Sequence, residues 1–269
     1  MREADRDALI ERTAQALVQT RRAVALTGAG VSIESGIPPF RGPGGLWEKM
    51  DPMEVAHIDA FRRDPGRVWK LLIEGMQAVL SAARPNAGHA GLARLEQWGY
   101  LRAVITQNVD GLHQAAGSRE VIEFHGTFAW QRCQECGSRC ETGRVDLSRV
   151  PPRCSCGGIY RPDCVFFGEM IPPQHLARAQ QLVARCDVLL VVGTSATVHP
   201  AAMIPLLAKD AGARVIEINP EPTPLTGRVS DYLIQGSAGA VFNAILGCVE
   251  ELRGSGGGHL EPPGRPSPG

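Results

Sequence analysis

Short apolar runs rich in Val, Ile, Leu and Ala alternate with amphipathic segments along most of the chain. The runs lie at residues 23–28, 102–107, 187–193 and 214–219. Apolar residues recur with helical spacing at residues 3–20, 88–98, 174–185, 200–210 and 239–252. Near-continuous apolar strands that alternate with helices are typical of a parallel sheet covered on both faces. We therefore predict an α/β fold with a Rossmann-like sheet, whose ligands bind at the carboxyl ends of the strands.

Two segments interrupt this alternation and are expected to form a smaller domain beside the sheet. Residues 43–84 show helix and loop patterns without a strand, and residues 127–160 are rich in Cys, Gly and Pro. The large domain is then expected to comprise residues 1–42, 85–126 and 161–252. Residues 253–269 are almost entirely Gly, Pro, Ser and polar residues, a composition that predicts a disordered tail.

Composition narrows the class of protein. The 269 residues include 28 Lys or Arg and 28 Asp or Glu, so the formal net charge is zero. Zero charge argues against bulk electrostatic binding of nucleic acid, and no apolar stretch has the length of a membrane span. The charged N-terminus lacks the apolar core of a secretory signal. We expect a cytoplasmic monomer that binds neither membrane nor nucleic acid directly.

The cysteines have the spacing of a metal site. CQEC and CSC place Cys133, Cys136, Cys154 and Cys156 in two close pairs. Four thiolates in two such pairs can fill all four positions of a tetrahedral zinc ion, which is the structural type of site. Cys140 is an alternative ligand, and four reduced cysteines without a metal are the other interpretation. We predict one structural Zn²⁺, which leaves the chemistry to other residues.

The stretch TGAGVSIESGIPPFRG, residues 27–42, follows an apolar run and begins like a dinucleotide-binding turn. The third glycine of the G-x-G-x-x-G fingerprint is replaced by Ile33, however, and two prolines follow. Pro38 and Pro39 disfavour a continuing helix and predict an irregular loop. By itself such a loop favours a stiffened surface connection.

Polar residues follow the other expected strands. Asn108 and Asp110 come after the second strand, and His125 ends a short apolar run. Such residues are common in turns, and His89, His113 and His199 are other candidate histidines, but the edge of a parallel sheet also places them against a ligand. Further candidates for phosphate or ribose follow the later strands: Gly193, Thr194, Ser195, Asn219 and Glu221. Gln107 and Asn108 stand where a dehydrogenase carries a ribose-binding acid, which argues against that class.

Taken together, these motifs resemble the sirtuin family over about residues 5–250. The matching stretches are GAGVSIESGIPPFR (28–41), PNAGH (85–89), TQNVDGLH (106–113), FHG (124–126), the paired cysteines, RPDCVFFGE (161–169), GTSATVHP (193–200) and INPEP (218–222). The resemblance implies an NAD-dependent protein-lysine deacylase with a large Rossmann-like domain and a small zinc-bearing domain. Its partners would be proteins or peptides that contain acetyl-lysine.

The resemblance also implies a role for each matching residue. Asn108 and Asp110 would bind the nicotinamide amide, and His125 would act as general base. The loop after the glycine turn would be a lid with Phe40 and Arg41 on the nicotinamide side. The remaining NAD contacts would come from Gly28, Ala29, Gly30, Ser32, Gln107, Gly193, Thr194, Ser195, Asn219, Glu221 and Ala238, and the substrate backbone would pair with Val165, Phe166, Phe167 and Gly168.

The acyl group is expected to be uncharged. Sirtuins that prefer succinyl or malonyl lysine carry a Tyr and an Arg three residues apart, and the stretch KLLIEGMQAVL after Trp69 has neither. A carboxylate in an apolar pocket would be strongly disfavoured. Acetyl is the expected group, with longer aliphatic chains as an alternative. Two further alternatives are protein mono-ADP-ribosyl transfer and NAD sensing without turnover.

Overall fold

The structure is a computed structural model that describes residues 2–40, 44–48 and 50–255. Its centre is a six-stranded, wholly parallel sheet with the strand order β3-β2-β1-β7-β8-β9. The order reverses between β1 and β7, so the switch point of this α/β sheet lies between those two strands. The strands are β1 Ala23–Thr27, β2 Leu101–Thr106, β3 Val121–Glu123, β7 Val188–Val192, β8 Arg214–Asn219 and β9 Tyr232–Gln235.

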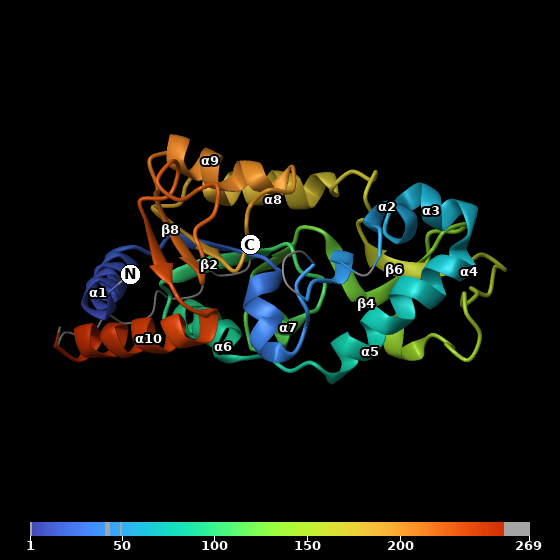
Figure 1. The fold of residues 1–269 in the computed structure, drawn as a ribbon, viewed down its shortest axis with the longest axis horizontal. Helices are drawn as coiled ribbons and strands as arrows, with labels where there is room; N and C mark the ends of the chain where they lie inside the picture. Colours follow the sequence, from blue (N-terminus) through green and yellow to red (C-terminus); the bar gives the residue numbers. More distant parts are fainter. Residues whose placement is uncertain (1, 41–43, 49, 256–269) are drawn as a thin grey trace, which may run out of the picture.

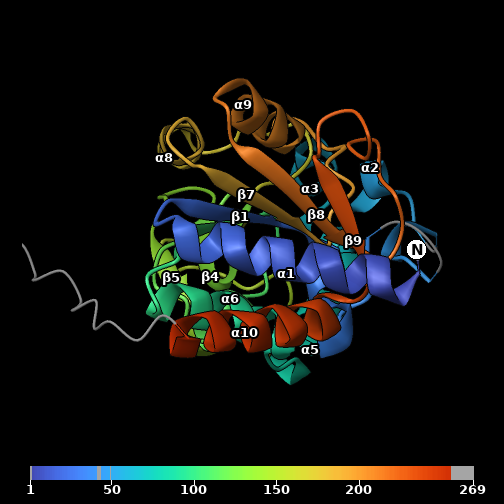
Figure 2. The same ribbon diagram turned by 90° about the vertical axis from the view of Figure 1, so that its left-hand side faces the viewer.

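Helices cover both faces of this sheet, as the apolar runs predict (Figures 1 and 2). Successive residues of a strand point to opposite faces, so Ala23 and Ala25 of β1 pack in one core and Val24 and Leu26 in the other. One core lies under α1, α6 and α10, and the other under α8 and α9. The helices are α1 Glu3–Gln19, α6 Ala87–Gln97, α8 Pro173–Val183, α9 Ile204–Asp210 and α10 Ala238–Ser255.

A second group of elements lies at one end of the molecule (Figure 1). Its antiparallel sheet has the order β5-β4-β6, formed by Arg139–Glu141, Gly126–Cys133 and Tyr160–Cys164. The described part of residues 43–84 forms helices without a strand, as expected: α2 Pro52–Val55, α3 Ile58–Arg63, α4 Pro65–Val68, a π turn η3 Trp69–Ile73 and α5 Glu74–Ala82. The fully buried Trp69 joins helix to sheet, because its indole Nε1 donates to the carbonyl of Tyr160 at 3.0 Å.

Several elements differ from the sequence prediction. Strands β3, β9 and the three of the small sheet are not among the predicted strands, and the helix predicted from residue 200 begins as a 3-10 turn, η5 Ala201–Met203. Helix α10 continues to Ser255, so residues 253–255 of the expected disordered tail are helical; the rest of that tail lies outside the described residues. Within the described chain, no helix is both long and apolar enough to cross a membrane.

Candidate active site

The glycine turn lies at the switch point of the sheet and packs against the loop that follows β7. The amide of Gly28 donates to the carbonyl of Val192 at 3.1 Å, and that of Gly30 to the carbonyl of Gly193 at 2.8 Å. A Cβ at Gly30 would stand 2.7 Å from the Cα of Gly193, so this contact requires a glycine. After the turn the chain forms a short 3-10 helix, η1 Ala29–Ser35, in place of the long phosphate-binding helix of a dehydrogenase.

The loop after η1 folds back on itself and reaches the segment that follows β6. The amide of Trp47 donates to the carbonyl of Phe40 at 3.0 Å, and their rings stack with centroids 5.5 Å apart. The Trp47 ring also lies 6.4 Å from that of Phe167. Aromatic contacts therefore join the expected lid to the expected substrate segment. Arg41, the other residue predicted on the nicotinamide side, lies outside the described residues.

Asn108, Ser32 and Asp110 form one hydrogen-bonded network beside the glycine turn. Asn108 is 5% exposed, and its Nδ2 donates to the carbonyl of Gly28 at 3.2 Å and to Oγ of Ser32 at 3.0 Å. The Ser32 hydroxyl in turn donates to Oδ2 of Asp110 at 2.8 Å. The structure thus brings Ser32 to Asn108 and Asp110, which lie more than 70 residues further along the chain. The network holds the amide and the carboxylate in fixed positions at the strand end.

Two buried histidines, His89 and His113, lie next to this network. From the sequence they were only alternative candidates to His125. Nδ1 of His89 accepts the amide of Asn86, so the proton of the neutral ring is on Nε2, 3.4 Å from Oγ of Ser32. His113 contacts Oγ1 of Thr27 at 2.9 Å, and the two imidazole centroids are 4.8 Å apart. Burial lowers the pKa of both rings, that of His113 to about 3. Both are therefore neutral supports of the strand-end network.

His125 is held with one ring nitrogen available as a base. Its Nδ1 lies 3.0 Å from the carbonyl oxygen of Gln107. A carbonyl can only accept, so Nδ1 carries the proton of the neutral ring and Nε2 has a free lone pair. Burial lowers the pKa of His125 below its ordinary value, and the hydrogen bond to Gln107 acts in the opposite direction. The imidazole is thus neutral and able to accept a proton at physiological pH.

The strand ends beyond the switch point hold each other in place. Nε2 of Gln107 donates to Oγ1 of Thr194 at 3.0 Å, and Nδ2 of Asn219 donates to the carbonyl of Thr194 at 3.1 Å. These three predicted cofactor residues are therefore also structural partners of one another. Ser195 and Glu221 are exposed at the same edge of the sheet.

The adenine end of the expected cofactor site is joined to the glycine turn by a residue that the sequence analysis missed. Glu34 in η1 accepts hydrogen bonds from the hydroxyl of Ser237 at 3.0 Å and from the amide of Gly239 at 2.8 Å. The buried Ala238 lies between them at the start of α10. The S-x-E spacing after the glycines gives no signal for this contact, because it depends on where α10 packs.

The expected substrate segment, residues 165–168, runs beside His125. The amide of Val165 donates to the carbonyl of His125 at 2.8 Å, and Phe167 pairs through its amide and carbonyl with the chain at Ala56 and Ile58. Phe166 is the core residue of the two phenylalanines, being 5% exposed. Among the hydrogen bonds of the described residues, none uses the carbonyl of Val165 or the amide of Gly168.

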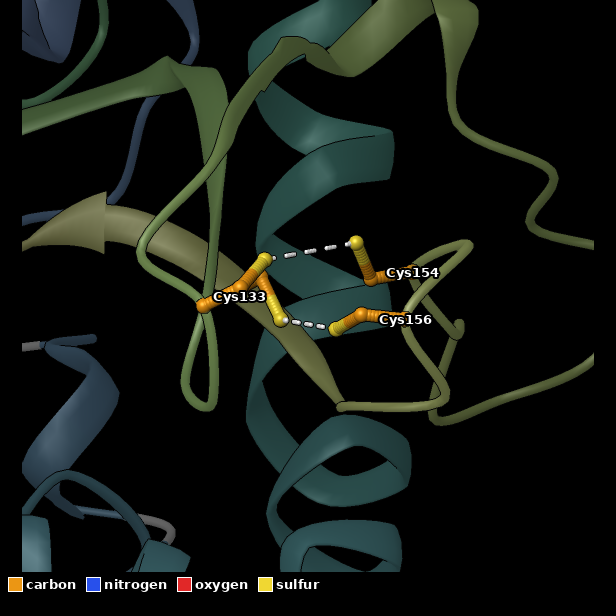
Figure 3. A group of neighbouring side chains, drawn as sticks. Cys133, Cys154 and Cys156 are labelled. Carbon is orange, nitrogen blue, oxygen red and sulfur yellow. Dashed lines mark hydrogen bonds between the residues drawn. The ribbon is translucent and has the colours of Figure 1, made fainter.

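The four paired cysteines converge, whereas Cys140 is not part of the group. Their Sγ atoms all lie within 4.8 Å of one another, with 3.5 Å between Cys133 and Cys156 and 3.8 Å between Cys136 and Cys154. Figure 3 shows Cys154 and Cys156 pointing from one loop toward Cys133 on the other. A tetrahedral zinc site with bonds of about 2.3 Å has sulfur–sulfur edges of about 3.8 Å. The residues therefore fit a four-coordinate zinc ion with no open position.

Fold and site together define a Rossmann-like nucleotide-binding protein with a zinc module. Comparison with known proteins makes the class specific: the model of the Sir2 family matches residues 28–200. NAD-dependent protein deacylase 2 of Pyrobaculum aerophilum is 51% identical over 241 residues, 89% of this chain and 94% of that protein. NAD-dependent protein deacylase 1 of Archaeoglobus fulgidus is 46% identical over 237 residues, 88% and 96% of the two chains.

Solved structures agree with the sequence comparisons. The crystal structure of a Sir2 homolog–NAD complex has a TM-score of 0.83 and 45% identity, and covers 90% of this chain and 94% of that one. A Sir2–p53 peptide–NAD+ structure has a TM-score of 0.80 and 35% identity, and covers 91% and 98%. This chain belongs to the Sir2 family, the sirtuins.

Proposed function

We propose that this chain is an NAD-dependent protein-lysine deacetylase, which transfers the acetyl group of acetyl-lysine to ADP-ribose and releases nicotinamide. The observation that carries the proposal is the meeting of His125, Asn108 and Asp110 beside the glycine turn at the switch point. The relatives named as NAD-dependent protein deacylases and the Sir2 structures with NAD and peptide support it. When bound, NAD supplies the acceptor, because loss of its nicotinamide leaves ADP-ribose to take the acyl group.

The chain's own residues have three tasks in this reaction. Asn108 and Asp110, fixed through Ser32, hold the nicotinamide amide and orient it for departure. His125 accepts a proton at Nε2 from a ribose hydroxyl, while its Nδ1 keeps its hydrogen bond to Gln107. Phe40 and Trp47 of the lid exclude water from the nicotinamide side.

Other residues bind the rest of the cofactor and the substrate. The backbone groups of Gly28, Ala29 and Gly30 approach the pyrophosphate, as amides of a strand-end glycine turn do. The residues that complete the cofactor site are Ser32, Arg41, Gln107, Gly193, Thr194, Ser195, Asn219, Glu221 and Ala238. The substrate backbone adds as a strand to residues 165–168, where the carbonyl of Val165 and the amide of Gly168 remain for it.

The zinc ion held by the four cysteines has a structural task. Cys133 ends strand β4, and His125 lies immediately before that strand. Strand β4 bulges between Thr127 and Gln131, and the β6 partners of its two ends, Cys164 and Tyr160, are only four residues apart, roughly 13 Å at ~3.3 Å per residue. The four sulfur ligands leave the ion no open position, so it cannot bind a reacting group. The small sheet and its helices would then form a separate small domain, which also includes residues 161–164 of β6, although the sequence analysis placed them in the large domain.

The cellular setting is a further part of the proposal. The structure joins none of the eight cysteines in a disulfide, which supports a reducing compartment such as the cytoplasm. We propose a monomer, with acetyl-lysine proteins as its partners and no direct binding of nucleic acid, in keeping with the zero net charge.

Incubation of the purified protein with NAD and an acetyl-lysine peptide tests the proposal. Mass spectrometry should show free lysine peptide, nicotinamide and acetyl-ADP-ribose in equal amounts, all dependent on NAD. Release of nicotinamide without deacetylation, with ADP-ribose mass added to protein, would instead establish ADP-ribosyl transfer. Binding of NAD without any product would support the sensing role.

A specific observation favours longer aliphatic acyl groups as second substrates. An apolar cluster of Val55, Ala56, Leu72 and Met76 lies beside Phe167, and Phe40 and Trp47 pack against it. Acyl peptides of increasing chain length, with succinyl peptide as the charged comparison, would show whether the cluster receives the acyl chain.

A further inference from the structure

A buried ion pair closes the turn that we assign to the substrate backbone. Arg161 lies in β6 and is 1% exposed, and its Nη2 donates to Oε1 of Glu169 at 2.7 Å. Its Nη1 donates to the carbonyl of Cys164 at 3.1 Å, and the guanidinium carbon lies 4.8 Å from the centre of the Phe166 ring. The other oxygen of the carboxylate, Oε2, accepts the amide of Phe166 at 2.9 Å. Both charged groups therefore bind backbone within the segment that they enclose.

The position of these contacts determines what the pair can do. The bound carbonyl of Cys164 and the bound amide of Phe166 lie on either side of Val165. The amide of Val165 donates to the carbonyl of His125, so this residue connects the base to the substrate segment. Its carbonyl is one of the groups left for the peptide. The ion pair thus fixes the backbone on both sides of the residue that faces substrate and base.

Stability alone does not account for this pair. A buried ion pair often contributes no more to stability than apolar residues of similar volume, because both charges lose their hydration. The surroundings here are apolar, with Phe61, Trp69 and Phe166 in the same core, and Nε of Arg161 has no hydrogen-bond partner among the described residues. Apolar side chains could fill this space, but they could not hold a backbone carbonyl and a backbone amide.

We propose that Arg161 and Glu169 are positioning residues for the acyl-lysine peptide, and that they act by holding residues 164–166 in the shape that the peptide backbone pairs with. The inference rests on the proposed function, because it concerns the same cleft. Neither side chain touches the glycine turn or the network around Asn108 in the described structure, so NAD binding should be independent of the pair.

Two variants test the inference. Glu169→Gln removes the charge with little change of shape. Arg161→Met combined with Glu169→Leu removes both charges, so no unpaired charge remains to unfold the protein. In both, the Kd of a fluorescein-labelled acetyl-lysine peptide, measured by anisotropy, should rise by about tenfold, the effect of losing one or two hydrogen bonds. The Kd of ADP-ribose, measured by calorimetry, should stay within about twofold, and hydrogen exchange should accelerate at residues 164–168.

A matched control separates this effect from the loss of any ion pair. Arg178 and Glu120 have the same two side chains at the same Nη2–Oε1 distance of 2.7 Å, but they are 38% and 44% exposed and lie at the β3 side of the large sheet. Glu120→Gln should leave peptide binding unchanged. A folded double variant that binds peptide like the wild type would overturn the inference, as would an equal loss of peptide and ADP-ribose binding. Failure of the proposed function is distinguishable, because the wild-type protein itself would then not deacetylate.

Discussion

At the scale of single residues, the hydrogen bond between Nδ1 of His125 and the carbonyl of Gln107 decides which nitrogen can act. His125→Ala removes the base and should lower kcat by about 10²–10⁴. Because burial lowers the pKa of His125, the wild-type kcat/KM should fall only below pH 6.5, as the imidazole becomes protonated. This acidic limb should be absent from the residual activity of the variant. Unchanged kcat in a variant with normal zinc content and Tm would contradict the assignment.

The buried His113 should make the free energy of unfolding depend on pH. Its pKa is lowered to about 3 by burial and by the neighbouring His89, whereas the unfolded chain has the ordinary value of 6.5. The neutral ring therefore contributes stability that is present above pH 6.5 and is lost as the pH falls from there toward 3. Between pH 7.5 and 5.5 this amounts to about 1.4 kcal/mol. The decrease in unfolding free energy over this interval, from urea titrations, should be smaller by that amount in His113→Gln. An identical decrease in both proteins would show that the pKa of His113 is the same in the folded and the unfolded chain, and would contradict the prediction.

At the scale of elements, the buried central strands could be predicted from their apolar sequences, whereas a short edge strand could not. The buried strands β1, β2, β7 and β8 are largely apolar runs, interrupted only by single polar residues such as Arg102 and Glu217, and all were predicted to within one residue at each end. Strand β9, with the sequence YLIQ, is a short edge strand and has no such pattern. The same distinction applies to the site: motif residues such as Asn108 could be found from the chain, whereas the Glu34 contact to α10 arises only from packing.

The contact between the loops after β1 and β7 leads to a prediction about glycine. In Gly30→Ala the new Cβ would lie 2.7 Å from backbone atoms of Gly193, which cannot move away as a side chain can. We expect a loss of about 1–3 kcal/mol in unfolding free energy and a higher KM for NAD. Gly75→Ala is the control: it lies in α5 with no atom within 4 Å of the new Cβ, and should stabilise by up to about 1 kcal/mol. Equal effects of the two substitutions in urea titrations would refute the steric argument.

At the scale of the whole molecule, strand β4 connects the two chemically distinct ends of the small sheet. It begins beside His125 and ends at Cys133, and the expected substrate segment follows β6, its neighbour in the same sheet. Zinc at the far end therefore stabilises the strands from which the proposed base and the proposed substrate segment extend. Loss of the metal should weaken activity through folding, without any change in the acid–base chemistry.

Substitution of single cysteines tests this arrangement. Cys154→Ser should purify with less than one zinc per chain and with a lower Tm, because one of the four thiolates is lost and binding of the metal contributes to folding. Cys140→Ser should keep one zinc per chain and wild-type activity, since its thiol lies outside the converging group although it is on the adjacent strand. Metal analysis by mass spectrometry, together with thermal unfolding, measures both outcomes. Loss of zinc from the Cys140 variant would make that residue a ligand, and full zinc content in Cys154→Ser would mean that three thiolates suffice to hold the ion.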